Sequence, residues 1–396
     1  MRRAPRASSN ALLSAWTPTG LAVRRAAEVP TCAWRAKGAG RSCRMWVVEQ
    51  AGPGRAHGGR RRLVLISGAA LVLLVAGVLI LGFTPVLDGD LESRPAPAAD
   101  YAAAAAMAAE LQAADGPEVN PVCRTQVLDH GQRTTRSVVL LHGYTNCPAQ
   151  FSVMARAYYD AGYNVVLARI PEHGLADRMT RALSDLEPED LTRFADSTVD
   201  VAAGLGDRVS VVGLSAGGTL AAWLAAERDD IAEVALVAPL MVPKVLPETT
   251  VGPVSRLGGL LPDLYLWWDG NLKEQLATPP YAYPRYSIHS LGSLLAVGRR
   301  AQGRVDRMVP LERLLVVTND NDAAVKNAAV ARVADHLGDH ATERVDHVFP
   351  EDLGYKHDIV DPQGENAADL EAIYTTLGPL LGIPDLTTTL RDSRTQ

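Results

Sequence analysis

Short apolar segments alternate with segments of helical periodicity from residue 137 onward. The apolar segments at residues 137–143, 163–170, 208–215, 232–240, 312–320 and 343–350 predict buried strands. The segments at residues 148–162, 187–206, 217–230, 323–338 and 366–381 have helical spacing. Strands that are apolar throughout and alternate with helices predict an α/β fold, with a mostly parallel sheet covered by helices on both faces.

A run of 21 uncharged residues, 63–83, precedes this region. As a helix it would span roughly 30 Å, the thickness of a bilayer core. The apolar core of a cleaved signal peptide is shorter, about 7–15 residues, and a buried core helix is rarely apolar without interruption. We therefore interpret the run as an uncleaved transmembrane helix. Because Arg60, Arg61 and Arg62 stand directly before it, the positive-inside rule predicts a cytoplasmic N-terminus and an extracytoplasmic remainder.

The charge of the chain differs on the two sides of this run. Residues 1–62 contain 13 Lys and Arg but 2 Asp and Glu, and their composition predicts a disordered basic cytoplasmic tail. The remainder contains 26 Lys and Arg but 43 Asp and Glu. We expect no nucleic-acid partner for this acidic part, because phosphate binding requires a basic surface.

The part beyond the predicted membrane span divides into three regions. Residues 84–121 are expected to form a linker with a short Ala-rich helix, 122–385 the α/β domain, and 386–396 a flexible C-terminus. Within the domain, the alternation of strands and helices stops between about residue 240 and 304. A segment this long in a compact domain typically has a function. We interpret it as a cap over the ends of the strands, where open α/β sheets bind ligands.

Ser215 lies at the centre of the sequence Gly213-Leu214-Ser215-Ala216-Gly217, between a predicted strand and a predicted helix. A sharp strand-to-helix turn lifts a serine Oγ out of the sheet and requires small neighbours, which the two glycines supply. The helix N-terminus that follows favours developing negative charge. These features predict a nucleophilic serine. A turn serine in a nucleotide-binding protein is the alternative, but no Gly-x-Gly-x-x-Gly or Walker pattern accompanies it.

A serine nucleophile requires a base and an acid that orients the base. Of the nine histidines, His357 is the best candidate base, because it follows the last predicted strand in a loop where active-site residues collect. A solvated loop histidine is the alternative. Asp320 and Asp322 follow the penultimate strand, and a carboxylate there reaches a histidine on the neighbouring loop. Either aspartate could instead cap the next helix.

The chain from about Cys123 onward resembles the α/β-hydrolase superfamily. Within it, the chain is similar to the serine-aminopeptidase and monoacylglycerol-lipase-like branch and to bacterial carboxylesterases. The resemblance rests on LHGYTN after the first clear strand, RIPEHG after the second, GLSAGG at the serine, TNDNDAAV after the penultimate strand and KHD after the last. These motifs occur in the superfamily's order of nucleophile, acid and histidine.

The resemblance implies a role for each matching position. Ser215 becomes the nucleophile and His357 the base. The backbone N–H groups of Ala216 and Tyr144 become the oxyanion donors. Further positions stand out: His142 and His173, which would shape loops rather than carry protons, and Glu172, where many relatives have Gly.

The acid is also assigned by resemblance. Members of the superfamily often read Gly-x-x-Asp-x-x-Val there, and Asp322 with Val325 fits this pattern. Asp322 therefore ranks above Asp320. Asn319 stands in place of the Gly, and Asn tolerates a positive φ, so we expect the turn to survive.

The implied activity is acyl transfer through an acyl-enzyme. We expect a membrane-anchored serine hydrolase that cleaves small-molecule or lipid-like carboxylic esters, without cofactor or metal; the sequence does not predict an oligomeric state. A peptidase or acyltransferase on the same triad, or a non-catalytic binding protein, is the alternative. Aromatic residues in the cap favour apolar acyl groups, and ordinary core packing is their alternative. They are Tyr265, Trp267, Trp268, Tyr281, Tyr283 and Tyr286.

Four cysteines divide evenly between the two sides of the predicted membrane span. Cys32 and Cys43 lie in the tail and are expected to be free thiols. Cys123 and Cys147 lie beyond the span, and an even pair outside the cytoplasm predicts a disulfide. This bond would tie the segment before the first strand to the loop of Tyr144; two buried thiols are the alternative.

Overall fold

The computed structural model describes residues 77, 91–257, 262–271, 279–303 and 309–395. The predicted basic tail lies outside these residues, as does the predicted membrane span except for Gly77. Within the described ranges, no helix is both long and apolar enough to cross a membrane.

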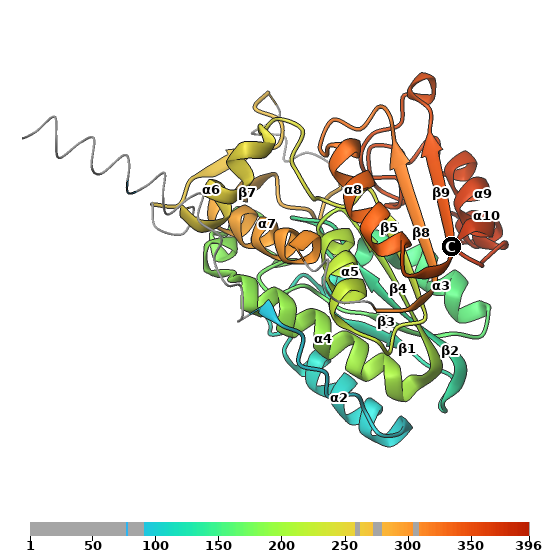
Figure 1. The fold of residues 1–396 in the computed structure, drawn as a ribbon. Helices are drawn as coiled ribbons and strands as arrows, with labels where there is room; N and C mark the ends of the chain where they lie inside the picture. Colours follow the sequence, from blue (N-terminus) through green and yellow to red (C-terminus); the bar gives the residue numbers. More distant parts are fainter. Residues whose placement is uncertain (1–76, 78–90, 258–261, 272–278, 304–308, 396) are drawn as a thin grey trace, which may run out of the picture. The chain divides into compact units, whose positions relative to one another are not determined.

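A seven-stranded sheet forms the centre of the domain (Figure 1). Its strands run in the order β1-β3-β2-β4-β5-β8-β9, and every neighbouring pair is parallel except β1 with β3. This confirms the predicted mostly parallel sheet, although the short strand β1 was not predicted. The strands are β1 (Gln126–Leu128), β2 (Thr134–Leu141), β3 (Asn164–Leu167), β4 (Gly206–Leu214), β5 (Glu233–Val237), β8 (Leu311–Asn319) and β9 (Ala341–Phe349).

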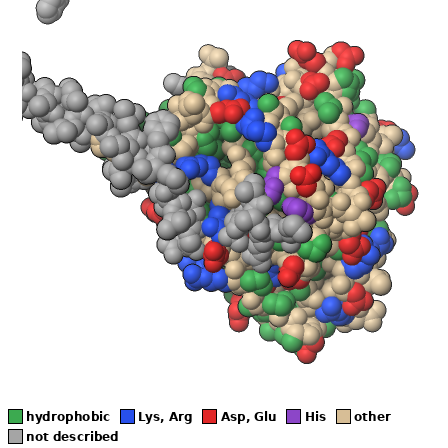
Figure 2. Space-filling model, viewed as in Figure 1, with side chains coloured by type: hydrophobic (Ala, Val, Ile, Leu, Met, Phe, Trp, Pro, Cys, Tyr) green, Lys and Arg blue, Asp and Glu red, His purple; other side chains and the backbone are tan. Residues whose placement is uncertain are grey.

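Helices cover both faces of the sheet, as the apolar strands require (Figure 1). One layer contains α4 (Pro188–Leu205), α5 (Ala216–Glu227), α7 (Ile288–Gly303) and α8 (Asn327–Gly338). The other contains α3 (Ser152–Asp160), α9 (Leu370–Leu380) and α10 (Leu386–Ser393). The apolar residues that fill the two interfaces are buried. On the face drawn in Figure 2, acidic and basic side chains are interspersed over the surface.

Helix α10 corrects one expectation, because residues 386–396 were predicted to be flexible. Leu386 and Leu390 lie four residues apart, so they share one face of the helix and are fully buried. This face packs against α3 and α9. Only two apolar residues in a polar sequence carry this interaction, which is too few to predict a docked helix without its partners.

The predicted cap range contains two kinds of structure. A two-stranded antiparallel hairpin, β6 (Tyr265–Trp267) with β7 (Arg285–Ser287), and the short helix α6 (Val251–Leu257) interrupt the alternation of strands and helices. Helix α7 starts directly after β7, but it packs against α4 and α5. By its packing, α7 therefore belongs to the helix layer, and the insertion that leaves this layer ends at β7.

The segment before the first strand is docked on the domain. Helix α2 (Tyr101–Ala113) packs against α4, and the indole Nε1 of Trp223 donates to the carbonyl of Leu91 (3.0 Å). A buried cluster reinforces this contact. The Ser93 hydroxyl donates to Asp196 (2.6 Å), which is paired in turn with the fully buried guanidinium of Arg228 (3.2 Å). The predicted short helix therefore lies against the domain rather than apart from it.

Arg228 is expected to be essential for stability. Its guanidinium also pairs with Asp200 (2.7 Å), so Arg228→Met leaves two buried carboxylates without their cation. Breaking a buried pair in this way costs about 3–5 kcal/mol. The free energy of unfolding of the full chain, measured by guanidinium denaturation, should fall by that amount. Arg208→Met is the control, because its half-exposed ion pairs are worth less than about 1 kcal/mol. Equal losses in the two variants would contradict the prediction.

Candidate active site

Ser215 occupies a strained turn at the carboxyl end of β4. Its backbone has φ 55° and ψ −113°, a conformation that non-glycine residues rarely adopt. Neighbouring segments hold it there: the Ser215 N–H donates to the carbonyl of Val237 at the end of β5 (2.9 Å), and the Leu240 N–H donates to the Ser215 carbonyl (3.0 Å). Helix α5 begins at the next residue, Ala216. Ser215 therefore lies at the sharp strand-to-helix turn that the sequence predicts.

The two flanking glycines are required by close backbone packing. A Cβ on Gly213 would lie 2.1 Å from the carbonyl oxygen of Gly217. A Cβ on Gly217 would lie 1.9 Å from the carbonyl oxygen of Leu141, at the end of β2. Neither position has room for any other residue. The spacing of the glycines around Ser215 is thus a direct consequence of how tightly the turn packs on β2.

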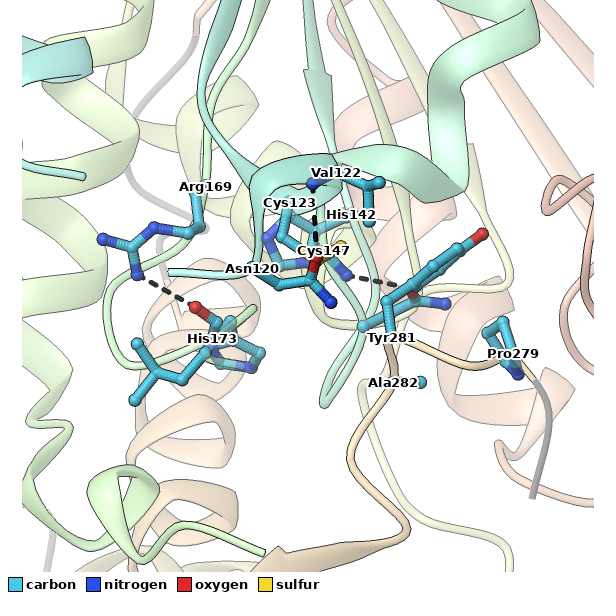
Figure 3. The surroundings of a disulfide bond; sticks show 12 residues. Asn120, Val122, Cys123, His142, Cys147, Arg169, His173, Pro279, Tyr281 and Ala282 are labelled. Carbon is cyan, nitrogen blue, oxygen red and sulfur yellow. Dashed lines mark hydrogen bonds between the residues drawn. A yellow bond between two sulfur atoms is a disulfide. The ribbon is translucent and has the colours of Figure 1, made fainter. Parts of the chain in front are cut away.

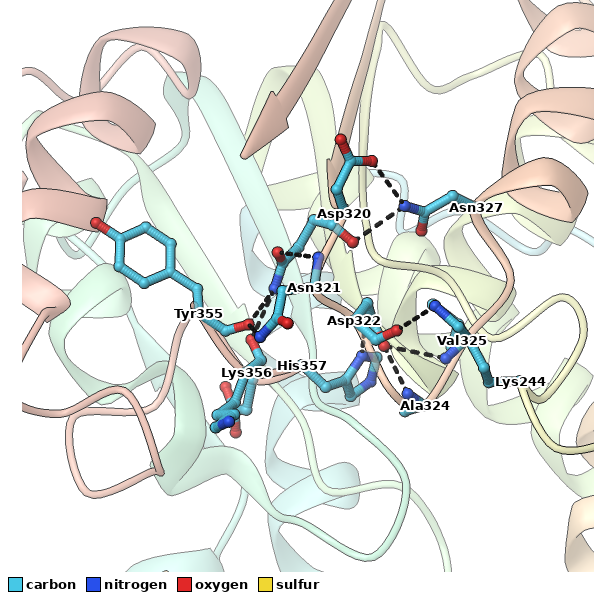
Figure 4. Close-up of polar contacts among 12 residues, drawn as sticks. Lys244, Asp320, Asn321, Asp322, Ala324, Val325, Asn327, Tyr355, Lys356 and His357 are labelled. Atoms are coloured by element: carbon cyan, nitrogen blue, oxygen red, sulfur yellow. Dashed lines mark hydrogen bonds and ion pairs between the residues drawn. The ribbon is translucent and has the colours of Figure 1, made fainter. Parts of the chain in front are cut away.

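Asp322 and His357 form a buried hydrogen-bonded pair (Figure 4). The Nδ1 atom of His357 lies 2.6 Å from Oδ2 of Asp322, whose side chain is fully buried. The other carboxylate oxygen accepts the N–H groups of Ala324 (2.7 Å) and Val325 (3.0 Å). The pair therefore lies in the loops after β8 and β9, at the same edge of the sheet as Ser215.

The pair shifts both pKa values. Burial alone would raise the pKa of Asp322, but the hydrogen bond and charge of His357, with the two backbone N–H groups, hold it below its usual value. Burial alone would lower the pKa of His357, but the hydrogen bond and charge of Asp322 raise it above its usual value. The Nε2 atom of His357 is buried and has no hydrogen-bond partner among the described residues, Ser215 included. The imidazole of His357 is therefore suited to accept a proton at Nε2.

Two backbone N–H groups are expected to be oxyanion donors, and the loop of one of them lies close to Ser215, since a Cβ on Gly143 would lie 3.6 Å from the Ser215 Cβ. Ala216 is the first residue of α5, and Tyr144 lies in the loop after β2. The Gly217 N–H donates to the carbonyl of His142 (3.0 Å), which binds this loop to the turn. In the part of the chain that the structure describes, neither the Ala216 nor the Tyr144 N–H has a partner. Both groups remain candidate oxyanion donors.

The comparison with known families agrees with this geometry. The model of the alpha/beta hydrolase family matches residues 138–360, more than half of the chain. The chain belongs to the alpha/beta hydrolase family. A thermostable monoacylglycerol lipase of Bacillus sp. (strain H-257) is 29% identical over 199 residues, which cover 49% of this chain and 74% of that protein. The crystal structure of a monoacylglycerol lipase from Paleococcus ferrophilus shares the fold, with a TM-score of 0.50 and 19% identity over 67% of this chain and 98% of that chain. This alpha/beta hydrolase thus has lipase- and esterase-like relatives.

Of the two candidate acids, the structure of this hydrolase brings only Asp322 to His357. Asp320 is exposed, and its side chain lies near Asn327 (3.4 Å), away from His357 (Figure 4). Asn319 differs from expectation, because it does not have a positive φ. It ends β8 instead, and its side-chain amide donates to the carbonyls of Tyr355 (2.7 Å) and Lys356 (3.2 Å). Asn319 thus holds the loop that carries the histidine, a role that the sequence did not reveal.

The predicted disulfide joins Cys123 and Cys147, with their Cα atoms 5.2 Å apart (Figure 3). The bond excludes the alternative of two buried thiols. It ties the turn before β1 to the loop that starts at the end of β2, three residues after Tyr144. The disulfide therefore restrains the loop that offers one of the candidate oxyanion donors.

The histidines expected to shape loops are both buried. Burial lowers the pKa of His142 well below its usual value and lowers that of His173 to about 4, so both rings are neutral. His142 Nε2 accepts the N–H of Ile170 (3.0 Å). Glu172, where many relatives have Gly, has a φ of 62°. The loop after β3 thus keeps a glycine-like backbone despite the glutamate.

The cap aromatics fall into two groups. Tyr281 and Tyr283 are buried, which agrees with ordinary packing. Trp268 is half-exposed and packs against Tyr286, with ring centroids 4.3 Å apart and the two ring planes tilted by 35°. It also packs edge-on against the ring of Tyr144 (6.0 Å). Aromatic contacts therefore extend from the cap to Tyr144, in the loop after β2.

The tightness of the turn gives a direct test. Gly217→Ala should lower the free energy of unfolding by at least about 3 kcal/mol, because the new methyl group meets a backbone carbonyl that cannot move aside. Gly303→Ala is the control, since nothing lies within 4 Å of its Cβ position and alanine favours a helix. Denaturant unfolding of both variants measures the difference. A Gly217→Ala variant as stable as the wild type would show that the turn is looser than described.

Proposed function

We propose that this alpha/beta hydrolase is a membrane-anchored serine hydrolase that cleaves carboxylic esters through an acyl-enzyme. The observation that carries the proposal is the buried Asp322–His357 hydrogen bond, at the edge of the sheet where Ser215 occupies a strained turn. A nucleophile, a base and an acid that orients the base are the parts that acyl transfer requires.

The mechanism assigns one role to each part. His357 Nε2 removes the proton from Ser215 Oγ, and Oγ attacks the ester carbonyl carbon. The N–H groups of Ala216 and Tyr144 bind the negative charge that forms on the carbonyl oxygen. The imidazolium then gives its proton to the departing alkoxide, and an alcohol leaves. A water molecule, deprotonated by His357, attacks the acyl-enzyme and releases the carboxylic acid and free Ser215. Asp322 keeps the Nδ1 proton of His357 in place throughout.

Two observations support esters with apolar acyl groups as substrates. The rings of Trp268, Tyr286 and Tyr144 form a continuous aromatic surface beside the candidate oxyanion donor. The relative from Bacillus sp. (strain H-257) is named a monoacylglycerol lipase. An aromatic surface binds acyl chains by burying apolar area.

The location of the enzyme is also a proposal. The uncharged run at residues 63–83, preceded by three arginines, supports a membrane anchor with a cytoplasmic N-terminus. The Cys123–Cys147 disulfide supports an extracytoplasmic catalytic domain, since disulfides persist in oxidising compartments. Together they indicate a domain that faces away from the cytoplasm and acts close to a lipid surface.

An activity screen tests the reaction and the nucleophile together. The full chain in detergent should hydrolyse p-nitrophenyl esters and bind a fluorophosphonate probe covalently. Ser215→Ala should abolish both the ester turnover and the covalent labelling, because it removes the hydroxyl that is the proposed nucleophile. Ester turnover should rise with acyl length if the aromatic surface binds the chain. Aminoacyl anilides complete the screen.

Cleavage of anilides without ester turnover would replace the esterase with a peptidase. Probe labelling that persists in Ser215→Ala would remove Ser215 from the mechanism.

The pH dependence follows from the raised pKa of His357. The base works only when neutral, so kcat/KM should fall as pH drops through a pKa above the usual value of about 6.5. Asp322→Asn should lower kcat by roughly 10³–10⁴-fold and move this limb to lower pH, since the charge that raises the pKa is gone. Asp320→Asn is the matched control and should leave both unchanged. The opposite ranking of the two variants would reassign the acid.

A further inference from the structure

Gln150 connects two loops of the candidate site. Its side chain is buried, with 2% of its surface exposed, and both ends of the amide are used. Oε1 accepts the backbone N–H of Gly143 (2.6 Å), and Nε2 donates to Oδ2 of Asp358 (2.6 Å). Gly143 directly precedes Tyr144, and Asp358 directly follows His357. One buried side chain therefore spans from the candidate oxyanion loop to the loop of the candidate base.

The Gly143 backbone is held at both its carbonyl and its N–H. Because His142 Nε2 accepts a hydrogen bond from Ile170, the proton of its neutral ring lies on Nδ1. Nδ1 then donates to the Gly143 carbonyl (2.9 Å). In a planar trans peptide the C=O and the next N–H point in opposite directions. Holding the Gly143 carbonyl with His142 therefore sets the direction of the Tyr144 N–H. The Gly143 N–H belongs to the preceding peptide, and its bond to Gln150 fixes the other side of the residue that joins the two peptides.

Asp358, to which the Gln150 side chain donates, is also held in place. Oδ1 of Asp358 accepts the N–H groups of Val360 (3.1 Å) and Asp361 (3.0 Å), which closes the turn after His357. Oδ2 accepts from Nε2 of Gln150 (2.6 Å) and, at a longer distance, from Nδ2 of Asn146 (3.5 Å). A second link runs parallel to the first: Asn146 donates to Asp361 (3.2 Å), whose other oxygen accepts the hydroxyl of Tyr281 (2.6 Å). Two side-chain links thus join the two loops.

We infer that Gln150 is a positioning residue, which sets the candidate oxyanion N–H of Tyr144 at a constant distance from the His357 loop. The inference rests on the proposed function, since it concerns how that site is aligned. A transition state needs the base and the oxyanion donors in place together, and small misalignments lower the rate without preventing binding. An amide fits here because Gly143 offers a donor and Asp358 an acceptor, and an amide presents the complement of both without a change of protonation.

The amide of Gln150 and the carboxylate of Asp358 can be exchanged by substitution. In Gln150→Glu, one carboxylate oxygen still accepts from Gly143, but the other faces the carboxylate of Asp358. In Asp358→Asn, the new side-chain NH₂ faces the NH₂ of Gln150, and turning the Gln150 amide over only moves the conflict to Gly143. The double variant Gln150→Glu/Asp358→Asn restores both contacts, because the introduced carboxylate then accepts from Gly143 and from the introduced amide. The total charge is unchanged.

The double-variant cycle is the test, made on the full chain in detergent with a p-nitrophenyl ester at a pH above the acid limb. Each single variant should lower kcat about 10–100-fold with KM within about threefold, because alignment of one oxyanion donor is lost. The double variant should recover kcat to within about threefold of the wild type. Asn164→Asp is the control for a buried amide changed to a carboxylate. Asn164 holds loop carbonyls at the start of β3, far along the strand from the site, so this variant should lower the melting temperature and leave kcat unchanged.

Three outcomes would overturn the inference. In the first, both single variants keep the wild-type kcat while they melt at lower temperature, which makes Gln150 merely structural. In the second, the double variant is no better than the worse single variant. In the third, a wild-type chain neither turns over esters nor binds the fluorophosphonate probe, which overturns the proposed function and this inference together. The wild-type control thus separates a failed site from a failed alignment.

Discussion

The strained backbone of Ser215 depends on the parallel register of β2, β4 and β5. The Ser215 N–H is held by the end of β5, and the Gly217 N–H by the residue after β2. These contacts require the three strands to end at the same level, and the pairing of Leu141 with Gly213 provides this. The turn cannot relax, because Gly217 lies against the Leu141 carbonyl. The geometry of the candidate nucleophile is therefore a property of the sheet rather than of a local motif.

Buried charge serves two different purposes in this chain. At the end of α5 opposite to Ser215, Arg228 pairs with Asp196 and Asp200, and Asp196 in turn binds Ser93 in the segment before α2. At the edge of the sheet, Asp322 is equally buried, but its partner is a histidine with a raised pKa, one nitrogen of which has no partner among the described residues. A cluster whose charges are paired stabilises a fold, whereas one with an available proton acceptor can do chemistry.

The sequence predicted those features that follow from local pattern. Alternating apolar segments predicted the sheet, and the glycine spacing predicted the turn of Ser215. The resemblance of Asp322 and Val325 to the superfamily's Gly-x-x-Asp-x-x-Val pattern ranked Asp322 above Asp320. What it missed depends on tertiary contacts. Asn319 was expected to adopt a positive φ, but it acts through its side chain on a loop 36 residues away. Gln150 lies in a segment of helical spacing and could not be distinguished from a surface glutamine. Long-range side-chain hydrogen bonds leave no periodic signal in a sequence.

The loop from Gly143 to Cys147 depends both on its local backbone conformation and on long-range contacts. Its residues are tied in four directions: the Tyr144 hydroxyl to Ser287 (2.8 Å), the Thr145 carbonyl to the N–H of Tyr283 (2.8 Å), Asn146 to Asp361, and Cys147 to Cys123. Thr145 itself has a φ of 63°. A loop held on all sides can keep a backbone N–H in place before any substrate arrives, and preorganised donors need no rearrangement during a reaction. Two of these contacts, to Ser287 and to Tyr283, lead to the cap. The cap, which would select a substrate, is therefore directly connected to the loop that would stabilise the transition state. A change in the cap aromatics should therefore affect turnover as well as binding.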